Sequence, residues 1–89
     1  MQEATLVNSL SRSEIRRRAG LTQLQLANLA GSSAPQICMW ERGDGRLPAE
    51  TILRIAAVLF EHLKEAPNFD NPEDLAQELT RATQRRVIG

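Results

Sequence analysis

The sequence of 89 residues contains one cysteine, Cys38, and one histidine, His62. A single thiol excludes an internal disulfide and a cysteine-rich zinc site, and a single imidazole argues against a histidine-based metal site. We therefore predict that the chain uses no metal or other cofactor. No motif brings a nucleophile, a base and an orienting group together, so we also predict that the chain is not an enzyme.

Long apolar runs and aromatic residues are also scarce. No apolar run reaches the roughly 18 residues of a membrane span, and no basic start leads into an apolar signal segment. We therefore predict no membrane association and a cytoplasmic location. One tryptophan and two phenylalanines are the only aromatic residues. No segment alternates apolar and polar residues for long, so no β-strand is predicted.

The net charge is zero, but the charge is unevenly distributed along the chain. Residues 1–46 carry six arginines against four acids, or +2, residues 47–80 carry −5, and residues 81–89 carry +3. This balance excludes a protein that coats polyanions without specificity and remains compatible with a local basic face. Ten of the eleven basic residues are arginine. The planar guanidinium group of arginine can make two parallel hydrogen bonds to a phosphate or to the edge of a guanine.

Helix signals recur along the chain. Two capping boxes, Ser11–Glu14 and Thr22–Gln25, each predict the start of a short helix. Gly20 and Gly31 are the expected left-handed terminators of these two helices. Within the second helix, Leu26, Ala27 and Ala30 share one face.

A third helix is predicted directly after Gly31. Ser33 is its expected N-cap, and Pro35 lies in the first turn, where proline is well tolerated. The helical period places Ile37, Trp40 and Glu41 on one side and the residues Pro35, Cys38, Met39 and Arg42 on the other.

Two further helices complete the prediction. One begins at Pro48 and is expected to end near Ala66, because Pro67 disfavours helical geometry in its predecessor. Its apolar stripe consists of Ile52, Ile55, Ala56, Leu59 and Leu63. After a turn over residues 68–71, Pro72 begins the last helix. The stripe of that helix is suited either to a dimer contact or to docking on the core, and consists of Leu75, Leu79 and Ala82.

The predicted fold is all-α: a compact bundle of about five short helices with a central helix-turn-helix, plus a C-terminal helix. Ala27 is small enough for the next helix to approach, and Gly31 opens the turn. We divide the chain into an N-terminal arm (1–10), a helix-turn-helix domain (11–66), and a C-terminal helix and tail (67–89) that is a candidate dimerisation element.

From Ile15 to Leu59 the sequence resembles the phage-repressor-like, Cro/C1-type helix-turn-helix family, also called XRE. The resemblance implies a bundle of about five helices that binds double-stranded DNA, usually as a homodimer, with the third helix in the major groove. The matching residues are Ile15-Arg16, Gly20-Leu21-Thr22-Gln23, Leu26-Ala27, Gly31, Ile37, Trp40-Glu41-Arg42-Gly43, Pro48, Glu50-Thr51 and Ala56.

The resemblance implies roles for individual residues. The positions that usually meet base edges are Ser33, Ala34, Pro35, Gln36 and Met39. The phosphate candidates are Gln23, Arg42 and Arg46. Apart from the resemblance, Arg17 and Arg18 are either solvated charges or peripheral phosphate contacts. Arg16 and Glu41 match an internal ion pair of the family. This pair holds the first helix against the third helix, which is the recognition helix that enters the major groove.

The base-reading positions depart from the usual pattern. Ala34, Pro35 and Met39 cannot make the bidentate hydrogen bonds that identify a base, although they can contact a thymine methyl group. Specificity is then expected to depend on Gln36, Arg42, methyl contacts and DNA shape. An inert thiol is the expected state of Cys38, and a redox role is the alternative.

We therefore predict a transcriptional regulator, either a repressor or an autorepressor of Cro, mobile-element or antitoxin type, with a toxin or another protein as an alternative partner. A second hypothesis keeps the fold but changes the function. Leu24, Pro35 and Met39 would form an exposed apolar patch, and such a patch often marks a protein-interaction module.

Overall fold

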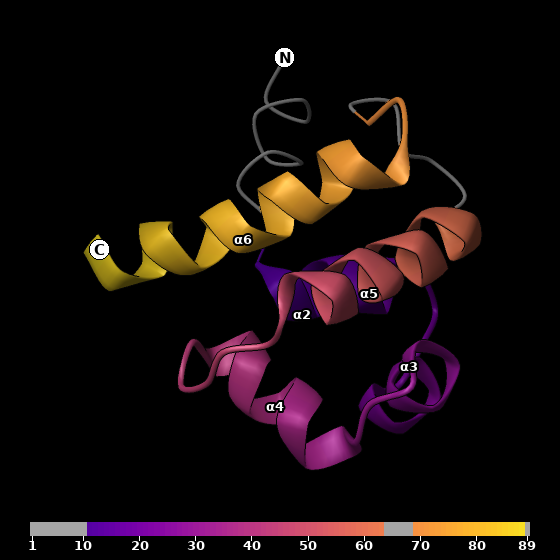
Figure 1. Cartoon of the computed structure of the whole chain (residues 1–89), viewed down its shortest axis with the longest axis horizontal. Helices are drawn as coiled ribbons and strands as arrows, with labels where there is room; N and C mark the ends of the chain where they lie inside the picture. Colours follow the sequence, from indigo (N-terminus) through magenta and orange to yellow (C-terminus); the bar gives the residue numbers. More distant parts are fainter. Residues whose placement is uncertain (1–10, 64–68, 89) are drawn as a thin grey trace.

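The computed structural model describes residues 11–63 and 69–88, with side chains described as far as Ala82. This part of the chain forms five helices and no strand (Figure 1), which confirms the predicted all-α bundle. The helices are α2 (Arg12–Arg18), α3 (Gln23–Ala30), α4 (Ala34–Arg42), α5 (Ala49–His62) and α6 (Pro72–Ile88). The predicted arm, residues 1–10, lies outside the described residues.

Local signals determine where most helices begin and end. The Thr22 hydroxyl accepts from the Gln25 N–H and the Gln25 side chain accepts from the Thr22 N–H, which completes the capping box of α3. At α2 the Ser11 hydroxyl accepts from the Glu14 N–H at 3.2 Å, while the Glu14 carboxylate lies 3.6 Å from Arg17. The predicted N-cap thus forms at both helices, but the full capping box predicted at each forms only at α3, because the Glu14 carboxylate of α2 lies toward Arg17.

The end of α5 differs from the sequence prediction. The helix ends at His62, and the prediction that it continues to near Ala66 is wrong. Leu63 still donates its N–H to the Leu59 carbonyl, but its own backbone is extended, with ψ 124°. Its half-buried side chain packs against the core. Pro67 limits only how far along the chain the helix can continue. The helix ends before that limit because Leu63 adopts an extended conformation, in which its side chain packs against the core.

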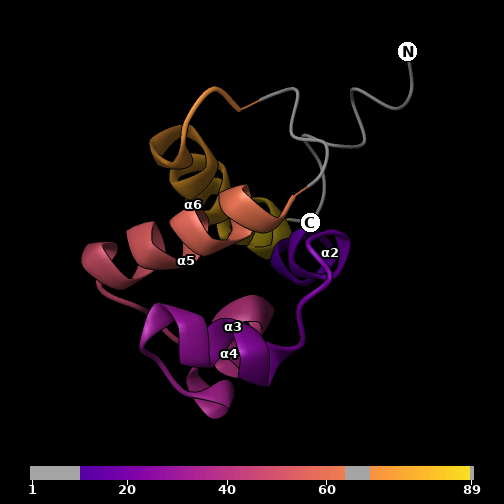
Figure 2. The same ribbon diagram turned by 90° about the vertical axis from the view of Figure 1, so that its right-hand side faces the viewer.

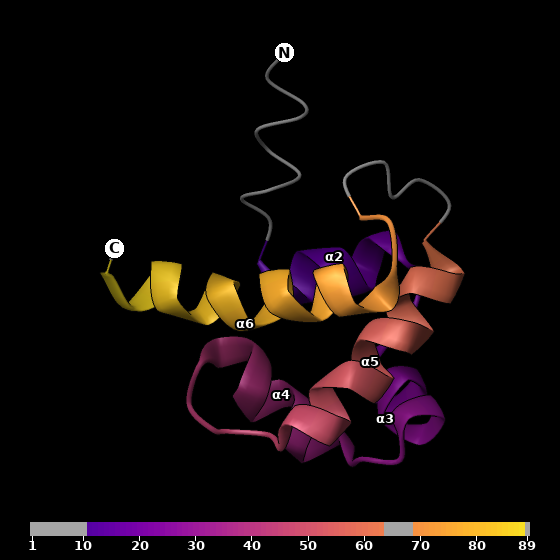
Figure 3. The ribbon, with the colours of Figure 1, turned by 45° about the horizontal axis from the view of Figure 1, so that its top comes forward.

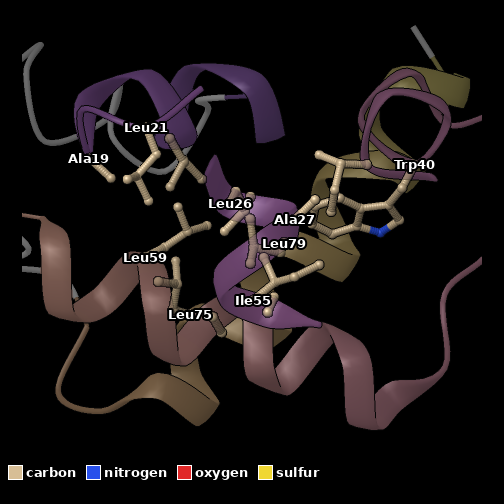
Figure 4. Packing of buried hydrophobic residues seen from close by; sticks show 13 residues of the cluster. Ala19, Leu21, Leu26, Ala27, Trp40, Ile55, Leu59, Leu75 and Leu79 are labelled. Carbon is tan, nitrogen blue, oxygen red and sulfur yellow. The ribbon is translucent and has the colours of Figure 1, made fainter. Parts of the chain in front are cut away.

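The core lies between two groups of helices (Figure 2), with α5 and α6 on one side and α3 and α4 on the other. Trp40 lies at one end of a cluster that receives side chains from every described helix (Figure 4). The largest fully buried side chains are Trp40, Leu26, Ile37, Ile55, Leu59, Leu75 and Leu79. Burial of each contributes about 1.5–3 kcal/mol.

The apolar stripe of α6 is part of this core. Leu75 and Leu79 are completely buried and Ala82 is 4% exposed. Of the two roles predicted for the stripe, the structure therefore shows docking on the core. A dimer contact that involves α6 must use another face of that helix.

Candidate nucleic-acid interface

A tight turn joins α3 to α4. Gly31 adopts a left-handed conformation (φ 72°), and the N–H of Ser32 donates to the Ala27 carbonyl at 2.8 Å. Ser33 then caps α4 by accepting the Gln36 N–H at 3.4 Å. Ala27 is fully buried, which permits the close approach of the two helices. Together these features produce the helix-turn-helix expected from the sequence.

One side of α4 is buried and the other is exposed. Ile37, Trp40 and Glu41 are each no more than 5% exposed. Pro35, Gln36, Met39 and Arg42 are exposed, Met39 by 44%. The core therefore holds the helix along its inner side and leaves the opposite side open to a ligand.

A buried polar cluster joins α2, α3 and α4. Arg16 donates through Nε to Glu41 Oε2 at 2.7 Å and through Nη2 to Oε1 at 3.3 Å. Its Nη1 donates to the Leu21 carbonyl at 2.9 Å. Gln23 Nε2 also donates to Glu41 Oε1, at 3.0 Å. The carboxylate of the recognition helix thus accepts three hydrogen bonds, so both preceding helices fix its position.

Gln23 was predicted from the resemblance as a phosphate contact that also steadies the recognition helix. Its side chain is half-buried and its amide bonds to Glu41. The structure therefore places it between α3 and α4, where it steadies the recognition helix. If the NH₂ group of Gln23 contacts a phosphate, it must either donate to the phosphate and to Glu41 together or give up its hydrogen bond to Glu41.

Arg12 is a structural residue that the sequence analysis missed. Its guanidinium lies 4.2 Å from the centroid of the Trp40 ring. Its Nη1 donates to the Trp40 carbonyl, and its Nε donates to the Leu79 carbonyl at 2.7 Å. Arg12 therefore links the first described helix to both α4 and α6. The available signal was its position four residues before Arg16, on the buried face of the same helix.

The base-reading candidates lie at the start and along the outer side of α4. Ser33, Pro35, Gln36 and Met39 are exposed, and Ala34 is half-buried. The Gln36 side-chain oxygen accepts from the Ser32 hydroxyl at 2.9 Å. This bond orients the amide so that its NH₂ group is the part available to a base edge.

The arginine candidates for phosphate contact are all exposed. Arg42 and Arg46 stand at the two ends of the loop that follows α4, and Arg42 pairs with Asp44 at 3.3 Å. Both side chains of this pair are about 60% exposed, so it contributes little stability and can be exchanged for a phosphate. Arg17 and Arg18 lie on α2, away from this loop in the sequence.

Among the side chains that the structure describes, four large apolar ones are exposed: Leu24, Leu29, Met39 and Leu53. Leu24 (58% exposed) and Met39, together with Pro35, are the residues of the alternative protein-interaction hypothesis. Leu29 and Leu53 were not singled out from the sequence. Cys38 is a free, half-buried thiol, and the exposed His62 places Nδ1 2.9 Å from the Val58 carbonyl.

The comparison with known protein families agrees with this geometry. The family model described as helix-turn-helix matches residues 13–65, which is more than half of the chain. The chain belongs to the Cro/C1-type helix-turn-helix family. The family resemblance stated from the sequence is therefore confirmed. No curated protein and no solved structure gave a significant match.

Membership of the Cro/C1-type helix-turn-helix family identifies residues 13–65 as a DNA-binding regulatory domain. Within the described ranges no helix is long and apolar enough to cross a membrane. The described side chains also contain no cluster of three or more His, Cys, Asp or Glu residues that could hold a metal ion.

Proposed function

We propose that this chain is a sequence-specific regulator of transcription that places α4 in the major groove of double-stranded DNA. The observation that carries the proposal is the division of α4 into a buried side, anchored by Trp40 and Glu41, and an open side. A major groove about 12 Å wide admits one helix. A rigid helix anchored on one side can enter it without a large loss of conformational entropy.

In this proposal, Gln36 is the principal hydrogen-bonding base reader. Its NH₂ group faces outward because its oxygen is engaged by Ser32, so it fits acceptors such as the N7 atoms of purines. Ser33 is the second polar candidate at the start of the helix. Ala34, Pro35 and Met39 supply apolar contacts suited to a thymine methyl group, and DNA shape supplies the remaining specificity.

Phosphate contacts are proposed for the exposed arginines and for the start of α3. Arg42 and Arg46 flank the loop after the recognition helix, and Arg42 exchanges Asp44 for a phosphate. The backbone N–H groups at the start of α3 attract an anion beside Gln23. Arg17 and Arg18 supply peripheral contacts. Each neutralised phosphate should add about −0.9 to the slope of log affinity against log salt.

We further propose that the regulator acts in the cytoplasm as a repressor or autorepressor of Cro, mobile-element or antitoxin type. It binds as a homodimer, with two recognition helices about 34 Å apart on a near-palindromic site. The exposed Arg42 and Arg46, which flank the loop after α4, support this mode of action, in which occupation of the site blocks transcription.

Selection of bound duplexes from a random pool tests the proposal directly. We expect an enriched site with two-fold symmetry, bound with a steep salt dependence. Changing both Arg42 and Arg46 to alanine should weaken binding to all duplexes alike and flatten the salt slope by about 2. The matched control is Arg54→Ala, which removes an exposed arginine from α5 and should leave the slope unchanged. An equal slope for the double variant and the control contradicts the phosphate assignment.

A protein-interaction module is the second candidate function. The exposure of Leu24 by 58% and of Met39 by 44%, beside the exposed Pro35, favours it. An apolar contact depends little on salt, so binding to a protein partner should survive salt concentrations that release DNA. Failure to enrich any duplex, combined with salt-resistant binding that is lost in Leu24→Asp, would support this function against the first.

A further inference from the structure

The loop that follows α4 turns back beside that helix before α5 begins (Figure 3). Gly43 ends the helix in a left-handed conformation, with φ 81°, and its N–H donates to the carbonyls of Met39 and Trp40. The N–H of Asp44 donates to the Met39 carbonyl as well, at 2.9 Å. The carbonyl of Met39 therefore holds the first two residues of the loop.

The side chain of Met39 lies against the third residue of the loop, Gly45. A methyl group added at Gly45 would lie 3.6 Å from Met39 Cβ and 3.7 Å from Met39 Cε. Both are ordinary van der Waals distances, so the backbone of Gly45 faces the methionine side chain at its base and at its tip. Met39 is also 44% exposed, so the same side chain forms part of the outer side of α4 and supports the loop.

Arg46 follows Gly45 directly and depends on the loop for its position. It is exposed, and no ion pair holds it among the residues that the structure describes. The next residue, Leu47, is half-buried and packs against the core. Arg46 therefore stands between one residue that faces Met39 and another that the core holds. Loss of the first support leaves the backbone before the arginine less ordered.

We propose that Met39 is a positioning residue, which holds the loop against α4 and thereby sets where Arg46 meets a DNA phosphate. A loop that is ordered before binding loses less conformational freedom in the complex, so the contact gains affinity. The inference rests on the proposed function, because it makes the phosphate contact of Arg46 depend on Met39. This task is separate from the contact of Met39 with a thymine methyl group.

Affinity for duplexes of unrelated sequence distinguishes positioning from base reading. Met39→Ala should weaken binding to all of them by about 5- to 20-fold, which is the scale of ordering one loop residue. Met39→Leu keeps an apolar side chain of similar volume and should regain all but about threefold of that affinity. The matched control is Leu29→Ala, which removes a 55% exposed side chain from α3 and should bind as the wild type does. A loss in Met39→Ala that is confined to one base position overturns the proposal.

Two double variants test whether Met39 acts through the loop. Added to Arg46→Ala, Met39→Ala should weaken binding by no more than about threefold, and fully additive losses contradict the proposal. Gly45→Ala should restore at least about threefold of the affinity that Met39→Ala loses. Its methyl group would contact the Cβ that alanine retains at position 39, and the φ of Gly45 lies outside the left-handed region.

Trypsin cleavage without DNA measures the order of the loop directly. The bond that follows Arg46 lies in the loop, whereas the bond that follows Arg54 lies within α5. Met39→Ala should speed cleavage after Arg46 by about fivefold and leave cleavage after Arg54 unchanged. Equal acceleration at both bonds, or none after Arg46, overturns the proposal. A wild type that binds no duplex contradicts the proposed function instead, and the cleavage rates still decide whether Met39 holds the loop.

Discussion

The buried pair of Arg16 and Glu41 provides the sharpest test of how the recognition helix is held. Their side chains are only 10% and 4% exposed, and the carboxylate accepts three hydrogen bonds from α2 and α3. In Glu41→Ala the Arg16 guanidinium keeps its bond to the Leu21 carbonyl but loses its counter-charge. Leaving a buried charge unpaired costs about 3–5 kcal/mol.

That cost is large for a chain of this size. At roughly 0.05–0.15 kcal/mol per residue, 89 residues give a free energy of unfolding of about 4–13 kcal/mol. We therefore expect Glu41→Ala to lower the urea midpoint strongly, with Trp40 fluorescence as the probe. Arg16→Met should also lower the midpoint, but by less, since it removes the charged partner of the Glu41 carboxylate and leaves the hydrogen bond from Gln23 Nε2 in place.

A double variant distinguishes the contribution of the ion pair to stability from the cost of leaving one of its charges unpaired. Arg16→Met combined with Glu41→Leu replaces both charges by apolar groups of similar volume, and we expect a loss of less than about 2 kcal/mol. The exposed pair Glu14 and Arg17, 3.6 Å apart on α2, is the matched control, and Arg17→Met should cost at most about 0.5 kcal/mol. Refutation is simple: if the losses of Arg16→Met and Glu41→Leu, each measured singly, add in the double variant, the residues do not act as a buried pair.

Three further measurements examine the turn and the outer side of α4. Gly31→Ala should lower the free energy of unfolding by about 1 kcal/mol in urea titration, because φ is 72° and the added methyl group meets open space. Ser33→Ala should cost about 0.5–2 kcal/mol in the same titration, since it removes the N-cap of α4. Gln36→Ala should relax the preference at one base position in a duplex selection, by about 1–3 kcal/mol, and an unaltered profile would remove Gln36 as a reader.

The sequence predicted the helix ends that depend on neighbouring residues. The capping box at Thr22, the N-cap at Ser33 and the left-handed terminator Gly31 each act within four residues, so their chemistry can be recognised without the fold. The buried side of α4 follows equally from the helical period, because Ile37 and Trp40 are three residues apart.

The features that the sequence did not predict depend on residues far apart in the chain. Arg12 bonds to carbonyl groups 28 and 67 residues away, so no local pattern indicates its role. The same holds for the end of α5, which the packing of Leu63 on the core decides. The sequence thus indicated the recognition helix and, through the family resemblance, its pair of Arg16 and Glu41, but not the contacts of Arg12.

Those contacts hold α4 at two points and connect it to a helix beyond the family match. Glu41 is held by Arg16 of α2, whereas Trp40 is held by Arg12 of the same helix. Arg12 in turn donates to the Leu79 carbonyl of α6. Helix α6 therefore helps to position the arginine that contacts Trp40. The family model ends at residue 65, before α6 begins. The orientation of the recognition helix is therefore a property of all five helices, since α6 stabilises it through Arg12 and through the burial of Leu75 and Leu79.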